Sequence, residues 1–207
     1  ATWLEKTQDD NNSFVRSLLP FMFILGISAF LAVVIQRDMG SGMVLLLSGL
    51  SMYLMAGPPL WLFGSAIAMF FSAGLAMIAI FPYRLARLTT FFNHKEDISG
   101  AGYHINQALI ALGSGGIMGK GLGKGLQSYG YLPESTNDSI FAILGEQFGF
   151  AGAMVVVSLF AGLIYRGLRI VRSAPDSFAR LVSVGITCWL GFQALINIAA
   201  MLNLIPL

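Results

Sequence analysis

Long apolar runs separated by short polar stretches dominate the pattern of the chain. The segment from Met39 to Tyr83 contains no Asp, Glu, Lys or Arg, and Gly57-Pro58-Pro59 interrupts it. An uncharged run of this length is long enough for two membrane-spanning helices joined by a tight turn. A second uncharged run, from Ser17 to Ile35, would extend about 28 Å as a helix, which is close to the thickness of the hydrocarbon core of a bilayer.

Two more apolar runs lie beyond a long polar stretch, so the pattern predicts five membrane-spanning helices. Lipid offers the backbone no hydrogen-bond partner, and the sequence lacks the ten-residue alternation typical of membrane barrels. We therefore expect an all-α protein, a polytopic transmembrane helical bundle that forms one membrane domain over residues 1–207 and carries a large loop. The predicted spans cover about residues 17–35, 40–57, 60–81, 139–165 and 181–202, and the loop covers residues 82–138.

Composition and charge support a membrane setting and orient the chain within it. Hydrophobic residues make up 56% of the sequence and charged residues only 11%, which is far from the composition of soluble domains. The net charge of +2 is too small to favour nucleic acid as a partner. A cluster of basic residues in the connection between the last two spans indicates a cytoplasmic loop, so residues 82–138 should face the outside. The cluster consists of Arg166, Arg169, Arg172 and Arg180.

Two carboxylates stand out in the stretch YLPESTNDSIFAILGEQFGF, residues 131–150. Asp138 directly precedes an apolar run, where an Asp commonly caps a helix and satisfies its free amide groups. Glu146 lies about 12 Å further along a helix, at a depth where a carboxylate requires a partner. A rotation of about 80° would place the two on neighbouring faces, directed into one cavity. Two interpretations stay open for Glu146: structural pairing with a basic or amide group, such as Gln193 or Asn197, and a direct functional role.

A glycine-rich segment, GSGGIMGKGLGKG at residues 113–125, precedes these carboxylates. Its spacing fits neither the P-loop nor the dinucleotide-binding glycine motif. Two interpretations stay open: backbone amides that bind an anion together with Lys120 and Lys124, or glycines that only permit close helix packing. His94 and His104 lack neighbours at ligand spacing, so the residues alone predict no metal site.

The order of these features resembles a known family. The stretch from Gly102 to Phe150 resembles the signature segment of the SEDS proteins, the FtsW, RodA and SpoVE group of bacterial peptidoglycan polymerases. The run Gln36-Arg37-Asp38-Met39-Gly40 resembles the family's Gln-Pro-Asp-x-Gly, and Arg84 with residues 87–91 resembles the Arg-rich beginning of its outer loop. Because the family has ten spans and this chain resembles the fifth to ninth, we expect it to be part of a longer protein.

Several positions depart from the family pattern. The usual His-Thr-Asp-Phe is Thr136-Asn137-Asp138-Ser139 here, which keeps Asp138 in register but changes its neighbours. The family's Glu-Glu is Glu146-Gln147. The spacing between Gly121 and Glu134 favours the FtsW and SpoVE branch over RodA.

The resemblance implies an inverting glycosyltransferase in the bacterial cytoplasmic membrane. It would polymerise lipid II into glycan strands on the outer face, for septal cell-wall synthesis in cell division, with Asp138 as the catalytic residue. The implied partners are undecaprenyl-diphosphate-linked glycan, a class B penicillin-binding transpeptidase, and other membrane proteins of the divisome or elongasome. A divalent cation, Mg²⁺ or Mn²⁺, is a candidate cofactor. The residues implied to bind substrate are Lys120, Lys124, Arg37, Arg87 and Glu134. The residues implied to order the cavity are Glu146 and Asp38.

Two other functions fit the same residues. A flippase for lipid-linked precursors would need polar side chains along a path through the bilayer, and Glu146, Gln193 and Asn197 are the candidates within the predicted spans. A noncatalytic scaffold for a division transpeptidase would not need the charged residues of the outer loop.

The arginine cluster predicts opposite accessibility for two serines in intact cells. In a Cys188→Ser background, Ser128→Cys should react with a membrane-impermeant thiol reagent, whereas Ser173→Cys should react only after the membrane is opened. Gel-shift labelling of the two variants measures this. Labelling of the cysteine at 173 but not of the one at 128 would reverse the orientation.

Overall fold

Helices account for all the regular secondary structure that the computed structural model describes, which confirms the predicted all-α class. The described residues are 1–6, 14–36, 38–80, 101–125 and 139–205. Within them, three helices are long and apolar enough to cross a membrane, namely Arg16–Ile35, Ile140–Ser173 and Ser177–Met201. Two shorter apolar helices, Met39–Met55 and Leu60–Ala76, accompany them. The chain is therefore an all-α membrane protein.

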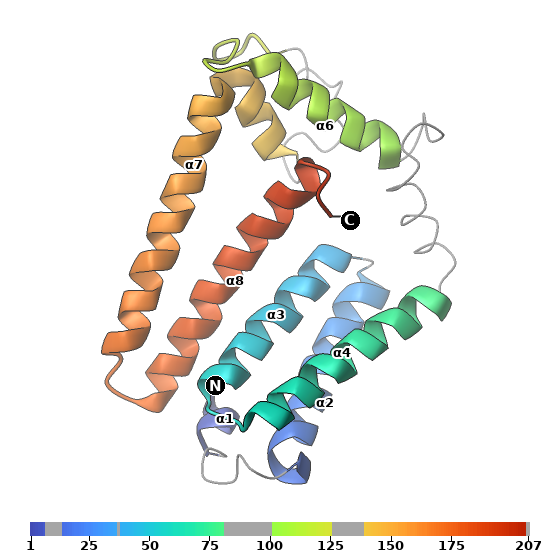
Figure 1. The fold of residues 1–207 in the computed structure, drawn as a ribbon, viewed down its shortest axis with the longest axis vertical. Helices are drawn as coiled ribbons and strands as arrows, with labels where there is room; N and C mark the ends of the chain where they lie inside the picture. Colours follow the sequence, from blue (N-terminus) through green and yellow to red (C-terminus); the bar gives the residue numbers. More distant parts are fainter. Residues whose placement is uncertain (7–13, 37, 81–100, 126–138, 206–207) are drawn as a thin grey trace. The chain divides into compact units, whose positions relative to one another are not determined.

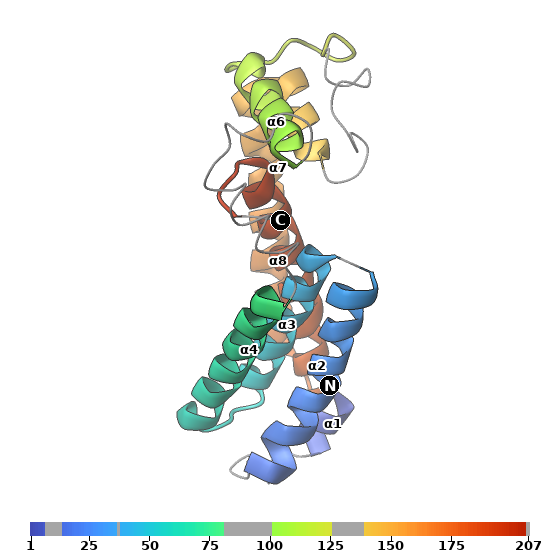
Figure 2. The same ribbon diagram turned by 90° about the vertical axis from the view of Figure 1, so that its right-hand side faces the viewer.

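The chain divides into two compact units. The first comprises Ala1–Ile80 and Ala161–Gln193, and the second comprises Phe81–Phe160 and Ala194–Leu207. In the first unit, α2, α3 and α4 lie side by side in both ribbon views (Figures 1 and 2). Its first helices are α1 (Thr2–Lys6), η2 (Phe14–Leu18), α2 (Leu19–Phe30), η3 (Leu31–Ile35), α3 (Met39–Met55) and α4 (Leu60–Ile80).

Aromatic stacking and small residues hold the first unit together. The rings of Phe21 on α2 and Tyr53 on α3 stack with centroids 4.7 Å apart, and the hydroxyls of Tyr53 and Ser17 lie within hydrogen-bonding distance at 3.5 Å. A Cβ atom at Gly49 would stand 2.6 Å from the side chain of Leu25, so a larger residue on α3 would require Leu25 on α2 to shift. Small residues serve the same purpose between helices in membranes.

Turn chemistry and acidic caps set the helix ends in this unit. The chain between α3 and α4 passes through Gly57, whose φ of 79° suits glycine, and through two prolines. Asp38 caps α3 by accepting a hydrogen bond of 3.0 Å from the backbone N–H of Ser41. Asp176 accepts a similar bond of 2.6 Å from Ala179 in the first turn of α8 (Ser177–Met201).

The second unit is built from α6 (Ala101–Gly115), the first part of α7 (Ile140–Ser173) and the end of α8. Helix α6 lies against the beginning of α7 in Figures 1 and 2. The buried residues between these elements are mostly small, which lets the helices approach closely. They are Ala108, Ala111, Phe141, Ala142, Ala200 and Met201.

Helix α7 breaks at Gly149, where φ is 67° and ψ is −165°. The short yellow part and the longer orange part of α7 run in different directions in Figure 1. The sequence predicts one uninterrupted helix over residues 139–165, and the structure corrects this to a short helix up to Gly149 and a longer one after it. The physical reason is that a left-handed backbone costs little for glycine alone.

The break predicts opposite effects for two glycine-to-alanine substitutions in α7. Gly149→Ala should destabilise the protein by at least about 1–2 kcal/mol, because its positive φ penalises a side chain and the new Cβ would collide with the backbone of Ile117 and Gly119. Gly162→Ala meets nothing within 4 Å and should stabilise α7 by about 0.5–1 kcal/mol. Thermal unfolding of the purified variants in one detergent measures both. Equal melting temperatures would contradict the break.

Candidate functional site

The loop that follows α6 binds both sides of the break in α7. We call residues 116–125 the glycine loop. Breaking a helix leaves carbonyl groups without partners on one side and N–H groups without partners on the other. The N–H groups of Lys120 and Gly121 donate to the carbonyls of Glu146 and Gln147, both at 3.0 Å. On the far side of the break, the N–H groups of Phe150 and Ala151 donate to the carbonyls of Gly116 and Ile117, at 2.8 and 3.1 Å.

Glycines make this close approach sterically possible. A Cβ atom at Gly119 would collide with the carbonyl of Gln147, and one at Gly115 would collide with the carbonyl of Gly145. Four glycines of the loop also adopt positive φ values, which other residues rarely tolerate. They are Gly116 (57°), Gly119 (78°), Gly121 (95°) and Gly123 (72°). The packing interpretation of the glycine-rich segment therefore holds for residues 115–121.

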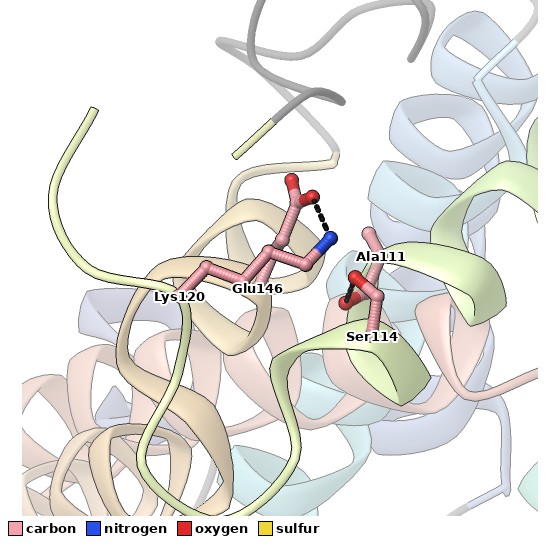
Figure 3. A network of polar contacts seen from close by, with 4 residues as sticks. All are labelled: Ala111, Ser114, Lys120 and Glu146. Atoms are coloured by element: carbon pink, nitrogen blue, oxygen red, sulfur yellow. Dashed lines mark hydrogen bonds and ion pairs between the residues drawn. The ribbon is translucent and has the colours of Figure 1, made fainter. Parts of the chain in front are cut away.

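A partly buried ion pair joins the same two segments through their side chains. The ammonium of Lys120 lies 3.0 Å from the Oε1 atom of Glu146 and donates a hydrogen bond to it. Figure 3 shows the two side chains pointing toward each other across the gap between loop and helix, while the hydroxyl of Ser114 donates instead to the carbonyl of Ala111 in its own helix. The Glu146 side chain is 0% exposed and the Lys120 side chain is 35% exposed.

Lys120 is a partner for the carboxylate that Glu146 places in an apolar helix. The sequence analysis expects a basic or amide partner, with Gln193 or Asn197 as examples, and the structure shows the basic group of Lys120 in contact with Glu146. The Oε2 atom of Glu146 lies so close to Gly125 that a Cβ atom there would stand 2.6 Å away. Removing one member of a buried ion pair leaves an uncompensated charge, which commonly costs about 3–5 kcal/mol.

Ser139 forms the backbone cap at the beginning of α7. Its carbonyl accepts hydrogen bonds from the N–H groups of Ala142 and Ile143, at 3.0 and 3.2 Å, and its side chain is fully buried. The sequence analysis considers Asp138 as the cap of this helix, and because Asp138 lies outside the described residues, that interpretation stays a prediction.

The remaining predicted site residues divide into two groups. Lys124 is exposed on the glycine loop, and Asp38 is the exposed cap of α3 in the first unit. Four others lie outside the described residues, so their predicted roles stay predictions. These are Asp138, Glu134, Arg37 and Arg87.

The described residues contain no cluster of metal-ligating side chains. Within them, no three side chains of His, Cys, Asp or Glu gather closely enough to hold a metal ion. The Glu146 carboxylate is bound to Lys120 and that of Asp38 to Ser41. The described residues present a loop that is hydrogen-bonded to a broken helix, and Lys124 is exposed on this loop.

The whole chain matches one known protein family. Residues 1–207 match the family described as "Cell cycle protein" and named for FtsW, RodA and SpoVE. The chain is 39% identical over 208 residues to "Stage V sporulation protein E" of Bacillus subtilis (strain 168), which covers 100% of this chain and 56% of the relative. It is 37% identical over 206 residues to "Probable peptidoglycan glycosyltransferase FtsW" of Geobacter sp. (strain M18), covering 98% of this chain and 55% of that protein.

A protein of the same name from Escherichia coli O6:H1 is 35% identical over 209 residues, covering 100% of this chain and 50% of that relative. The chain thus spans about half the length of the curated relatives it matches.

The ion pair predicts that two lysines four positions apart differ in their effect on stability. Lys120→Gln removes the ammonium that pairs with the buried carboxylate of Glu146. It should lower the free energy of unfolding by about 3 kcal/mol, which is the lower end of the range for a buried pair, because the lysine is partly exposed. Lys124→Gln removes an exposed charge and should change stability by less than about 0.5 kcal/mol. Melting temperatures of both variants provide the measurement. Equal melting temperatures would mean that the pair contributes nothing to the fold.

Proposed function

The chain belongs to the FtsW/RodA/SpoVE family of cell cycle proteins, and on this premise we propose that it is part of a peptidoglycan glycosyltransferase that polymerises lipid II. The observation that carries the proposal is the match over the whole chain to relatives that bear this activity in their names. The register of Asp138 within the family's acidic motif supports the same assignment.

Asp138 is proposed as the general base of the reaction. The acceptor hydroxyl loses its proton to this carboxylate as its oxygen bonds to the anomeric carbon of the lipid-linked donor. The bond from that carbon to the diphosphate breaks in the same displacement, and its electron pair leaves with the diphosphate. An α-linked donor that becomes a β-linked glycan has inverted once, so one direct displacement without a covalent enzyme intermediate is sufficient.

Cations would stabilise the negative charge that develops on the departing diphosphate. Lys124 is the described candidate, since it is exposed on the glycine loop. Arg37 and Arg87 are further candidates from the resemblance, with Glu134 as an additional contact to the substrate. The Mg²⁺ or Mn²⁺ expected from the resemblance stays a proposal, with no step of the reaction assigned to it.

The proposed setting is the outer face of the bacterial cytoplasmic membrane, during septal wall synthesis in cell division. The arginine cluster at residues 166–180 supports an outward-facing glycine loop. A class B penicillin-binding transpeptidase is the proposed partner, because new glycan strands require crosslinking. The spacing between Gly121 and Glu134 supports the FtsW and SpoVE branch of the family.

The assignment of the base predicts that Asp138→Asn lowers polymerisation of labelled lipid II by roughly 10²–10⁴-fold, the usual contribution of general-base catalysis. Lipid II binding should persist, because the substitution keeps the size of the side chain. The measurement is glycan-strand formation by purified full-length protein, with lipid II binding followed in parallel.

Asp176→Asn is the matched control, because it changes another Asp beside a helix start, and Asn caps a helix about as well as Asp. It should polymerise at the wild-type rate. If Asp138→Asn keeps that rate as well, the catalytic assignment fails, and a flippase or scaffold becomes the better description.

A further inference from the structure

We propose that Lys120 and Glu146 form a positioning pair for this reaction, one that fixes the short first part of α7 against the glycine loop and does not itself contact the donor. The inference rests on the proposed function. It assigns to Lys120 a role other than the diphosphate binding expected from its charge.

The two segments are joined by side chains and backbone at the same residues. Lys120 donates its backbone N–H to the Glu146 carbonyl at 3.0 Å and its ammonium to the Glu146 carboxylate at 3.0 Å. Gly121 adds a third bond at 3.0 Å to the next carbonyl, that of Gln147. The two backbone bonds and the ion pair together hold the loop against the helix at Glu146 and Gln147.

The burial of Glu146 explains why Lys120 should stay in the pair during the reaction. The carboxylate is fully buried, so moving the ammonium to a diphosphate would leave a buried charge without its counter-ion. Lys124, on the same loop, is exposed and carries no such constraint. The loop therefore separates two tasks, with Lys120 holding the helix and Lys124 available to an anion.

The part of α7 that the pair holds is adjacent in sequence to Asp138, the proposed general base. The first part of α7 runs from Ile140 to the break at Gly149, and its cap, Ser139, is buried. A helix of two turns is stiff, so fixing it at Glu146 also fixes its beginning, about 10 Å away along the axis. The proposed base comes directly before Ser139 in sequence. Small errors in the placement of reacting groups can lower a rate by roughly 10²-fold.

A double-mutant cycle separates positioning from stability and from substrate binding. The variants are Lys120→Gln, Glu146→Gln, the double variant and Lys120→Arg, with Lys6→Gln as a control that removes an exposed lysine from α1. For each full-length protein, the melting temperature, the kcat and the KM for lipid II are measured. Hydrogen exchange over residues 139–151 reports on the helix without requiring activity.

Lys120→Gln should lower both the melting temperature and kcat. The double variant removes the stranded carboxylate, so its melting temperature should return toward that of the wild type, while kcat stays low by roughly 10-fold or more. The KM should stay at the wild-type value throughout, and exchange over residues 139–151 should rise in the double variant. Lys120→Arg should restore both stability and kcat, and Lys6→Gln should match the wild type.

Three results would overturn the proposal. Recovery of wild-type kcat in the double variant would make the pair a purely structural contact. A raised KM with unchanged kcat in Lys120→Gln would make Lys120 a substrate ligand. Unchanged exchange over residues 139–151 would show that the pair does not hold the helix.

If Lys120→Gln fails to fold, the double variant alone decides between these results. Absence of polymerisation by the wild-type protein would instead refute the proposed function, and the exchange measurement would still test the pair.

Discussion

A helix that breaks among apolar residues must find hydrogen-bond partners for the backbone groups it frees, and this requirement governs the second unit. The break in α7 frees carbonyls before Gly149 and N–H groups after it. The glycine loop supplies N–H groups to the first side and carbonyls to the second. Because one loop serves both sides, the break is a defined turn between two helices and not a point of weakness.

The buried carboxylate of Glu146 requires a partner in the same way as the freed backbone groups. A buried ion pair gains little stability over apolar side chains of similar volume, because the cost of removing both charges from water offsets their attraction. Losing one partner is expensive, however, so the pair strongly disfavours any arrangement in which loop and helix separate. The proposed positioning role uses this preference for a single arrangement. Small residues between α6 and α7, such as Gly115 and Gly145, also allow these two helices to pack closely.

The sequence predicts the helical class because long uncharged runs leave few alternatives in a membrane, and charged or Gly-Pro stretches separate those runs. It does not predict the break, because a single glycine leaves the apolar pattern of α7 intact. The contact between Lys120 and Glu146 joins residues 26 positions apart, and it exists only once several glycines adopt left-handed conformations. The glycines on both sides of Lys120 were the available signal. Glu134 and Asp138 lie outside the described residues, so their roles still depend on the resemblance.

The glycine loop is bound to α7 in a fixed register, and this limits how the segment can change in length. Two acceptors, Gly116 and Ile117, and two donors, Lys120 and Gly121, must meet their partners on opposite sides of Gly149. A single inserted or deleted residue at positions 118–119 would displace one pair of bonds relative to the other. Surface loops ordinarily tolerate such changes, whereas this one should accept new side chains at its exposed positions 118 and 122 and reject any change in residue number.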